Sequence, residues 1–301
     1  MQKYLIPFED CNPLPTLYIL GNGFDVAHGI KSTYANFRAF EISRDNQRFV
    51  NLMDIFFSNQ TDFWSDVETA LGHYDEDSII DFCNPEEEFD MDHPTRSEAA
   101  YSDSPDNIFQ PLLKDLKSEF REWVDSIEIK NAEKILSLSK DAYYLTFNYT
   151  DTLEAIYHIP SNNVFHIHGL RQSKDEYIVG HSNFRNEEST FDNSDVYFKQ
   201  ATRAKVIGWM NGLYKDANAI INRNSDYFNG LNDVKQIIVL GHSLNMVDLP
   251  YFLRIVEATG TDASWKFSFY GTQDINNINN FIKIAGLTNT KVIYFDEFLS
   301  K

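Results

Sequence analysis

Cysteine is scarce in this sequence, and its two cysteines, Cys11 and Cys83, are not spaced as a CxxC pair. This argues against a zinc ribbon and against a framework of disulfides. Long apolar runs are also missing, because no stretch approaches the ~18 residues that a membrane helix needs. The N-terminal segment MQKYLIPFEDCNP lacks the apolar core of a secretory signal. We therefore expect a soluble, cytoplasmic protein with no membrane partner.

Basic residues are the second shortage. The chain has 26 Lys and Arg against 45 Asp and Glu, which gives a formal net charge of −19. Affinity for nucleic acids comes largely from Lys and Arg that displace counterions from phosphates. No basic cluster is visible in the sequence, so no nucleic-acid partner is expected. Solubility and the avoidance of nonspecific partners explain such a surface.

Short apolar runs that alternate with helical segments predict the fold. The runs lie at Leu17–Leu20, Ala142–Thr146, Val164–Ile167, Tyr177–Val179, Gln236–Leu240, Trp265–Tyr270 and Lys291–Phe295. The clearest helix covers 108–127, where apolar residues recur at helical spacing and Trp123 is expected in the core. Strands that alternate with helices form parallel sheets covered on both faces. We predict an α/β, Rossmann-like fold with a mostly parallel sheet and a helical cap.

The chain of 301 residues is predicted to form a single α/β domain over 1–301 with two helical insertions, at 34–137 and 190–232. Within the first insertion, residues 84–106 contain three prolines, eight acidic residues and a single arginine. Such a composition buries too little apolar surface to offset the entropy of ordering. Residues 84–106 are therefore predicted to form an acidic loop.

The first apolar run ends in a glycine turn, Gly21-Asn22-Gly23, followed by Phe24, Asp25 and, later, Gly29. Glycine allows close approach of the backbone to a ligand, and a helix that begins after the turn offers free N–H groups to an anion. The order predicts a phosphate-binding turn, although a plain strand-to-helix turn uses the same residues. For Asp25 we consider two roles, an N-cap and a contact to a ribose hydroxyl.

A second glycine turn, Gly241-His242-Ser243, follows the run at Gln236–Leu240, and Asp248 precedes the next helix. In a doubly wound sheet, turns from neighbouring strands meet at the carboxyl edge, beside the crevice where ligands bind. Two such turns suit a ligand with two phosphates. We therefore assign both turns, together with Asp248, to the binding of a dinucleotide.

Polar residues follow two strands between these turns. The run that ends at Thr146 is followed by Asn148, Tyr149 and Asp151, and the next run carries His166 and His168. Thr146 and Tyr149 are assigned to ligand binding and Asn148 and Asp151 to catalysis. Period-two alternation places both histidines on one face of the sheet.

The histidine pair allows three interpretations. The histidines could bind a metal with His158 or His181 as a third ligand, they could be bonded to backbone groups at a strand end, or His168 could be a general base. The presence of Asn148 and of two glycine turns, all of them after strands, favours the catalytic interpretation.

GNGFDVAHGIKSTYANF at 21–37 and WSDVETALG at 64–72 resemble the AbiH family of bacteriophage abortive infection proteins. The layout is also similar to the sirtuin-like NAD-binding fold. The elements that follow the sirtuin order are Gly21 and Gly23, Gly29-Ile30, Phe37-Arg38, Thr146 with Asn148 and Asp151, His168-Gly169, and Gly241 with Ser243 and Leu244. The chain departs from sirtuins in lacking a four-cysteine zinc module, in having Asp25 in place of serine, and in the displacement of Asp151 by one residue.

The resemblance implies an NAD⁺ glycohydrolase that releases nicotinamide and ADP-ribose and depletes NAD⁺ in antiphage defence. Asn148 would orient the water or the ribose hydroxyls, and His168 would accept a proton. No metal and no cofactor beyond NAD⁺ as substrate is expected, and a homo-oligomer or a phage-derived trigger protein is expected to gate the enzyme. ADP-ribosyl transfer shares the first step and stays open. The alternatives are a nucleotide sensor without turnover and a metal-dependent nuclease, which the acidic charge disfavours.

Overall fold

The computed structural model describes residues 15–57, 63–84, 90–186 and 197–299. The chain forms two compact units. The sheet unit comprises Met1–Thr33, Val124–Ile178 and Asp216–Lys301, and the helical unit comprises Tyr34–Trp123 and Val179–Lys215. The expected insertion at 34–137 thus corresponds mainly to the helical unit, whereas the expected insertion at 190–232 is divided between the two units.

The sheet unit contains a six-stranded sheet in which every pairing is parallel. Its strands are β1 (Thr16–Leu20), β2 (Tyr143–Thr146), β3 (Val164–His166), β4 (Gln236–Leu240), β5 (Ser264–Phe269) and β6 (Thr290–Tyr294). The strand order is β3-β2-β1-β4-β5-β6. This is the order of doubly wound α/β sheets, with the reversal between β1 and β4. The predicted Rossmann-like fold class is confirmed.

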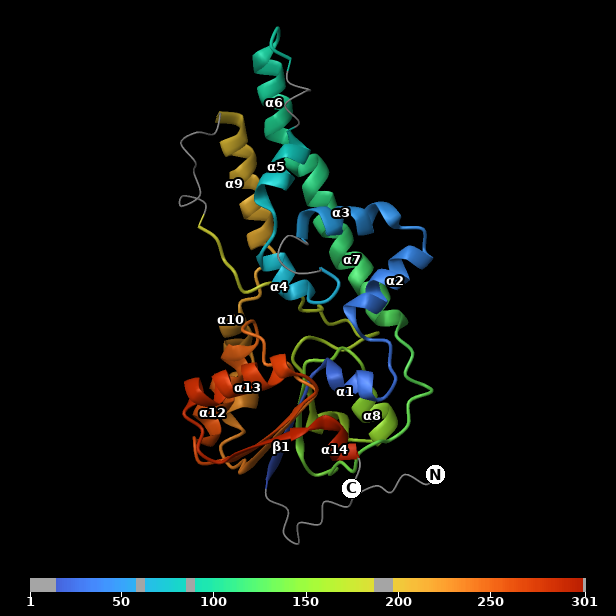
Figure 1. Ribbon diagram of the computed structural model, residues 1–301, viewed down its shortest axis with the longest axis vertical. Coiled ribbons are helices and arrows are strands. Elements are labelled where there is room, and N and C mark those ends of the chain that lie inside the picture. The colour runs from blue at the N-terminus through green and yellow to red at the C-terminus, as the bar shows by residue number, and fades with distance from the viewer. Residues whose placement is uncertain (1–14, 58–62, 85–89, 187–196, 300–301) are drawn as a thin grey trace. The chain divides into compact units, whose positions relative to one another are not determined.

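Helices cover both faces of this sheet (Figure 1). One face carries α1 (Asn22–Ala27), α8 (Thr152–Tyr157) and α14 (Phe295–Leu299), and the other carries α10 (Ala217–Arg223), α11 (Ser225–Asn229), α12 (Leu249–Thr259) and α13 (Thr272–Ala285). Right-handed crossovers explain the division, because the chain winds outward from β1 in one direction and from β4 in the other. The carboxyl ends of β1 and β4 therefore lie side by side at the centre of the sheet.

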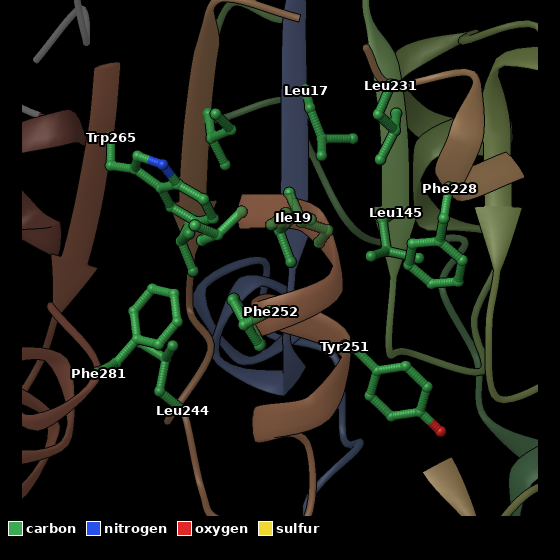
Figure 2. Close-up of a cluster of buried hydrophobic side chains, with 14 of the residues drawn as sticks. Leu17, Ile19, Leu145, Phe228, Leu231, Leu244, Tyr251, Phe252, Trp265 and Phe281 are labelled. Atoms are coloured by element: carbon green, nitrogen blue, oxygen red, sulfur yellow. The ribbon is translucent and has the colours of Figure 1, made fainter. Parts of the chain in front are cut away.

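The larger core lies between the sheet and α12. Tyr251 and Phe252 of α12 pack against apolar side chains of β1, β2 and β5, among them Ile19 and Trp265 (Figure 2). The helix begins at a proline-containing first turn and presents its apolar residues at helical spacing. The opposite core is smaller and includes Phe24 of α1 and Tyr157 of α8. Side chains of β1 and β2 contribute to both cores, so these two strands are packed on both faces of the sheet.

The expected strand at Tyr177–Val179 is wrong. After β3 the chain turns at Gly169, whose φ is +96°, and passes back over the end of that strand. The Ile178 N–H donates to the His168 carbonyl at 3.0 Å, and the Ile178 carbonyl accepts from the Tyr149 hydroxyl at 2.8 Å. A side chain thus takes the acceptor that a neighbouring strand would use, and the sheet ends at β3.

The helical unit consists of α2 (Tyr34–Ser43), α3 (Gln47–Phe57), α4 (Val67–Gly72), α5 (Glu76–Cys83), α6 (Pro94–Ser104), the π-helical turn η2 (Pro105–Phe109), most of α7 (Gln110–Ser126), and α9 (Tyr197–Asn211). Its core is aromatic. The ring centroids of Trp64, Phe120 and Trp123 lie 5.5, 5.7 and 5.2 Å from that of Phe37. The assignment of Trp123 to the core is confirmed.

The acidic loop predicted for 84–106 is wrong over most of its length, because Pro94–Ser104 form α6. Pro94 occupies the first turn, where its missing N–H costs nothing. The helix lies beside α9 (Figure 1). Basic residues of α9 pair with acidic residues of this region, as Lys205 does with Asp106 at 2.7 Å. Residues 85–89 and Cys11 lie outside the described residues.

Among the residues that the structure describes, no helix is long and apolar enough to cross a membrane.

Candidate functional site

The two glycine turns meet at the reversal point of the sheet, as the sequence predicted. The Gly21 N–H donates to the Leu240 carbonyl at 3.0 Å, and the Gly23 N–H donates to the Gly241 carbonyl at 2.8 Å. A Cβ atom on Gly241 would lie 2.2 Å from the Phe24 nitrogen, and φ of Gly241 is +64°. The absence of side chains therefore serves the close packing of one turn on the other, a reason that the sequence analysis had not considered.

The remaining residues of the first turn have structural partners. The Asn22 Oδ1 accepts from the Ser32 hydroxyl at 2.5 Å. Phe24 is fully buried in the smaller core, so its side chain does not face solvent or ligand. Gly29 has a φ of +74°, and a Cβ atom added to it would meet no neighbouring atom within 4 Å. The helix that follows the turn, α1, has only six residues.

Asp25 is 1% exposed, and both of its carboxylate oxygens are hydrogen-bonded. The Thr150 hydroxyl donates to Oδ2 at 2.6 Å and the Thr152 hydroxyl to Oδ1 at 2.9 Å. Burial raises the pKa of Asp25 to about 6, against the lowering effect of bonds from Thr150, Thr152 and Asn148. The expected ribose contact of Asp25 does not fit this arrangement. The carboxylate instead holds α1 to the loop after β2.

Asn148 lies at the same junction. Its side-chain amide donates to the Gly21 carbonyl at 3.1 Å and also to Asp25. Its backbone N–H donates to the Thr146 hydroxyl oxygen at 3.1 Å, which accounts for the threonine that ends β2. The end of β2 thus brings Asn148 beside the first glycine turn.

The prediction that His166 and His168 share one face of the sheet is wrong. β3 ends at His166, and the two following residues already belong to a turn, so that strand alternation no longer applies. The His166 Nε2 lies 2.9 Å from Oε1 of Glu154 on α8. The His168 ring lies instead on the face of α12, with its centroid 5.1 Å from that of Phe147 and 6.2 Å from that of Tyr251.

Because the two rings lie in different surroundings, His166 and His168 are not placed to bind one metal ion together. No group of three or more His, Cys, Asp or Glu side chains among the described residues is arranged to hold a metal ion. Of the two suggested third ligands, His181 has its Nε2 2.9 Å from the Met210 carbonyl. His158 ends α8 in a left-handed conformation with a φ of +58°.

Asp248 lies between two buried imidazoles. Its Oδ1 is 3.8 Å from the His168 Nε2, and its Oδ2 is 3.4 Å from the His242 Nε2. The side chains of His168, Asp248 and His242 are 5%, 10% and 4% exposed. The Leu244 N–H donates to the His242 Nδ1 at 2.9 Å. This cluster, which we call the His–Asp–His cluster, combines groups from the turns after β3 and β4.

Three predicted residues have other surroundings. Asp151 forms an ion pair with Arg171, with an Nε–Oδ1 distance of 2.5 Å. Both residues line a cavity of about 590 Å³ together with residues of 125–130. Tyr149 holds Ile178 through its hydroxyl. The side chain of Ser243 is exposed, and its carbonyl accepts from Asn277 at 2.8 Å.

Thr150, Thr152 and Glu154 were not predicted from the sequence. The polar run Thr150-Asp151-Thr152 at a helix start was the available signal, since the two threonines that flank Asp151 can reach a buried partner. His28 was not predicted either; its Nδ1 donates to the Phe24 carbonyl at 2.6 Å, and its Nε2 is 2.7 Å from the Tyr157 hydroxyl.

The fold and the site together define a doubly wound parallel α/β protein with a cluster of His, Asp and Asn side chains at the carboxyl edge of its sheet. Residues 17–269 match the family described as bacteriophage abortive infection AbiH. The chain therefore belongs to the AbiH family, which places it in antiphage defence by abortive infection. Comparison with curated proteins and comparison with solved structures gave no match.

Proposed function

We propose that this protein is an NAD⁺ glycohydrolase that acts in abortive infection by depleting NAD⁺. The observation that carries the proposal is the strand order, with its reversal between β1 and β4. Sheets of this order bind dinucleotides in the crevice outside the carboxyl ends of the strands at the reversal point. Asn148, His168, His242 and Asp248 all follow strands at this edge.

In the proposed reaction, water adds to the anomeric carbon of the ribose while the bond to nicotinamide breaks. Positive charge develops on the ribose ring, as in other glycosyl cleavages, and nicotinamide leaves as a neutral molecule. His168 accepts the proton that water or a ribose hydroxyl loses. A positioned base of this kind contributes about 10²–10⁴-fold in rate.

Asn148 is suited to orient the ribose or the water. Its amide nitrogen already donates to Gly21 and Asp25, so the amide plane is held from two sides. Its Oδ1 is the atom that would accept a hydrogen bond from a substrate hydroxyl. An orienting group that is fixed before substrate arrives loses little entropy on binding.

The test is nicotinamide release from NAD⁺ by the purified full-length chain. The expected result is release by the wild type and a loss of about 10²–10⁴-fold in kcat for His168→Ala, with a large loss for Asn148→Ala. Matched controls are His93→Ala, whose side chain is 71% exposed, and Asn218→Ala on the exposed surface of α10. Equal activity of all four variants would refute the assignment of these residues.

Such an activity has to be restrained in an uninfected cell. We further propose that self-association or a phage-derived trigger protein gates it. The assay is therefore run over a range of protein concentrations and with and without lysate of phage-infected cells. Absence of nicotinamide release under all of these conditions would refute the enzymatic proposal.

An alternative is a nucleotide sensor that binds at the same edge of the sheet without turnover. The N–H groups of Gly21 and Gly23 donate to the carbonyls of Leu240 and Gly241, so in either case a diphosphate has to use other donors. Calorimetric titration with NAD⁺ and with ADP-ribose separates the two proposals. Stoichiometric binding without any product in the same samples would support the sensor.

A further inference from the structure

The His–Asp–His cluster contains one acid and two bases, and the hydrogen bonds determine which base can change its charge. The decisive contact is the bond from the Leu244 N–H to the His242 Nδ1, at 2.9 Å. A nitrogen that accepts this bond carries no proton of its own. His242 is therefore neutral, with its proton on Nε2, the atom that faces Asp248.

The backbone maintains this arrangement. Leu244 has a φ of +51°, a conformation that non-glycine residues seldom adopt. The strained residue directs its N–H back onto the ring two positions earlier. Leu244 is itself held by the larger core, in which its side chain is buried (Figure 2). A second proton on His242 would place two N–H groups against each other and would break the contact.

The side chain of Asp248 does not cap the helix that it precedes. It is the N-cap residue of α12, yet its side chain makes no capping bond to the first turn of that helix. Its carboxylate instead faces His168 and His242. A buried carboxylate needs a compensating charge or strong hydrogen bonds. Because His242 is held neutral, His168 is the imidazole of this cluster that can supply the charge.

We infer that Asp248 is a positioning residue that orients His168 and stabilises its protonated form, and that His242 anchors Asp248 through a fixed Nε2–H tautomer. The consequence of this inference for catalysis rests on the proposed function, in which His168 is the base. The other rings against His168 belong to Phe147, Tyr149 and Tyr251, and tyrosines are neutral near pH 7. Within the His–Asp–His cluster, the charge of Asp248 therefore sets the proton affinity of His168.

The test is a pH titration of the histidine rings by NMR on the full chain, compared between wild type and Asp248→Asn. An opposite charge within ~4–6 Å moves a titration by about 1–3 pH units, so the His168 midpoint should fall by about one unit or more. The matched control is Asp216→Asn, which makes the same charge change at the N-cap of α10 and should leave His168 unchanged. An unchanged His168 midpoint in Asp248→Asn would overturn the inference.

A second measurement needs no variant. The ring ¹⁵N shifts of wild-type His242 should report a neutral Nε2–H tautomer at neutral pH, and an imidazolium at this position would overturn the inference even if Asp248→Asn fails to fold.

Activity separates this inference from the proposed function. In Asp248→Asn, kcat should fall with little change in KM, and the acid limb of the pH profile should move to lower pH. A shifted His168 titration in a protein without any NADase activity would refute the proposed function and keep the role of Asp248. Full NADase activity of Asp248→Asn with an unshifted His168 titration would refute the role of Asp248 and leave the proposed function standing.

Discussion

Replacing Asp25 by asparagine should stabilise the protein near neutral pH. The carboxyl is 1% exposed, and burial raises its pKa from the ordinary value of 3.8 to about 6. In the folded state the group therefore binds a proton more tightly than in the unfolded state. The free energy of unfolding must fall as the pH rises from about 4 to about 6, and it levels off above that range. Two pKa units correspond to about 3 kcal/mol at pH 7.

Asparagine has the same shape and no charge to desolvate. Its Oδ1 can accept two bonds, from one of the two threonine hydroxyls that bond Asp25 and from the Asn148 amide, and its Nδ2 can donate to the other threonine. We expect Asp25→Asn to raise the free energy of unfolding at pH 7 by up to about 3 kcal/mol, and to flatten its dependence on pH between about 4 and 6. Urea denaturation followed by circular dichroism measures both quantities.

The matched control is Asp262→Asn, an exposed carboxyl of the same unit, which should leave the pH dependence of stability as in the wild type. The reasoning would be refuted if Asp25→Asn were less stable than the wild type at pH 7 and kept the wild-type slope between about pH 4 and 6. Such a result would mean that the charged carboxylate is held more strongly by its hydrogen-bond donors than burial disfavours it.

Two further predictions concern stability. Gly241→Ala should cost about 3 kcal/mol or more, or prevent folding, because its Cβ would lie 2.2 Å from the Phe24 nitrogen at positive φ. Gly29→Ala, where the added Cβ meets no neighbouring atom, should cost only about 1 kcal/mol. Urea denaturation of both variants measures the two costs, and equal costs would contradict the packing of the two turns. Lys215 has a fully buried side chain 3.1 Å from Glu68, so Lys215→Met should cost about 3–5 kcal/mol and the added change Glu68→Gln should recover part of that loss. Thermal unfolding of the single and double variants measures the recovery, and its absence would show that the two charges do not depend on each other.

The sequence predicted all six strands with each bound within one residue of its place, and it predicted the parallel sheet and the meeting of the two glycine turns. It also predicted a seventh strand, at Tyr177–Val179, that does not form. These features depend on local information, namely apolar runs bounded by glycine. They also depend on the fixed handedness of the crossovers, which holds for every such sheet. The motif GNGFDVAHG also indicated the family, because a rare local sequence pattern can be recognised without knowledge of the fold.

The site depended on residues that are distant in the sequence. Asp25 became a structural anchor only because Thr150 and Thr152, more than a hundred positions later, take up both of its oxygens. His168 does not share the face of His166, because β3 ends at His166 and the next two residues belong to a turn.

By itself, then, the sequence determined where strands, turns and most helices begin, since apolar spacing and glycine act over a few neighbouring residues. Tertiary structure decided which polar side chains are buried, which atoms satisfy them, and that an acidic stretch with three prolines contains the helix α6. The physical reason is that the cost of burying a charge or ordering a polar segment depends on the partners that packing brings to it. For Asp25, Asp248 and α6, those partners come from other parts of the chain.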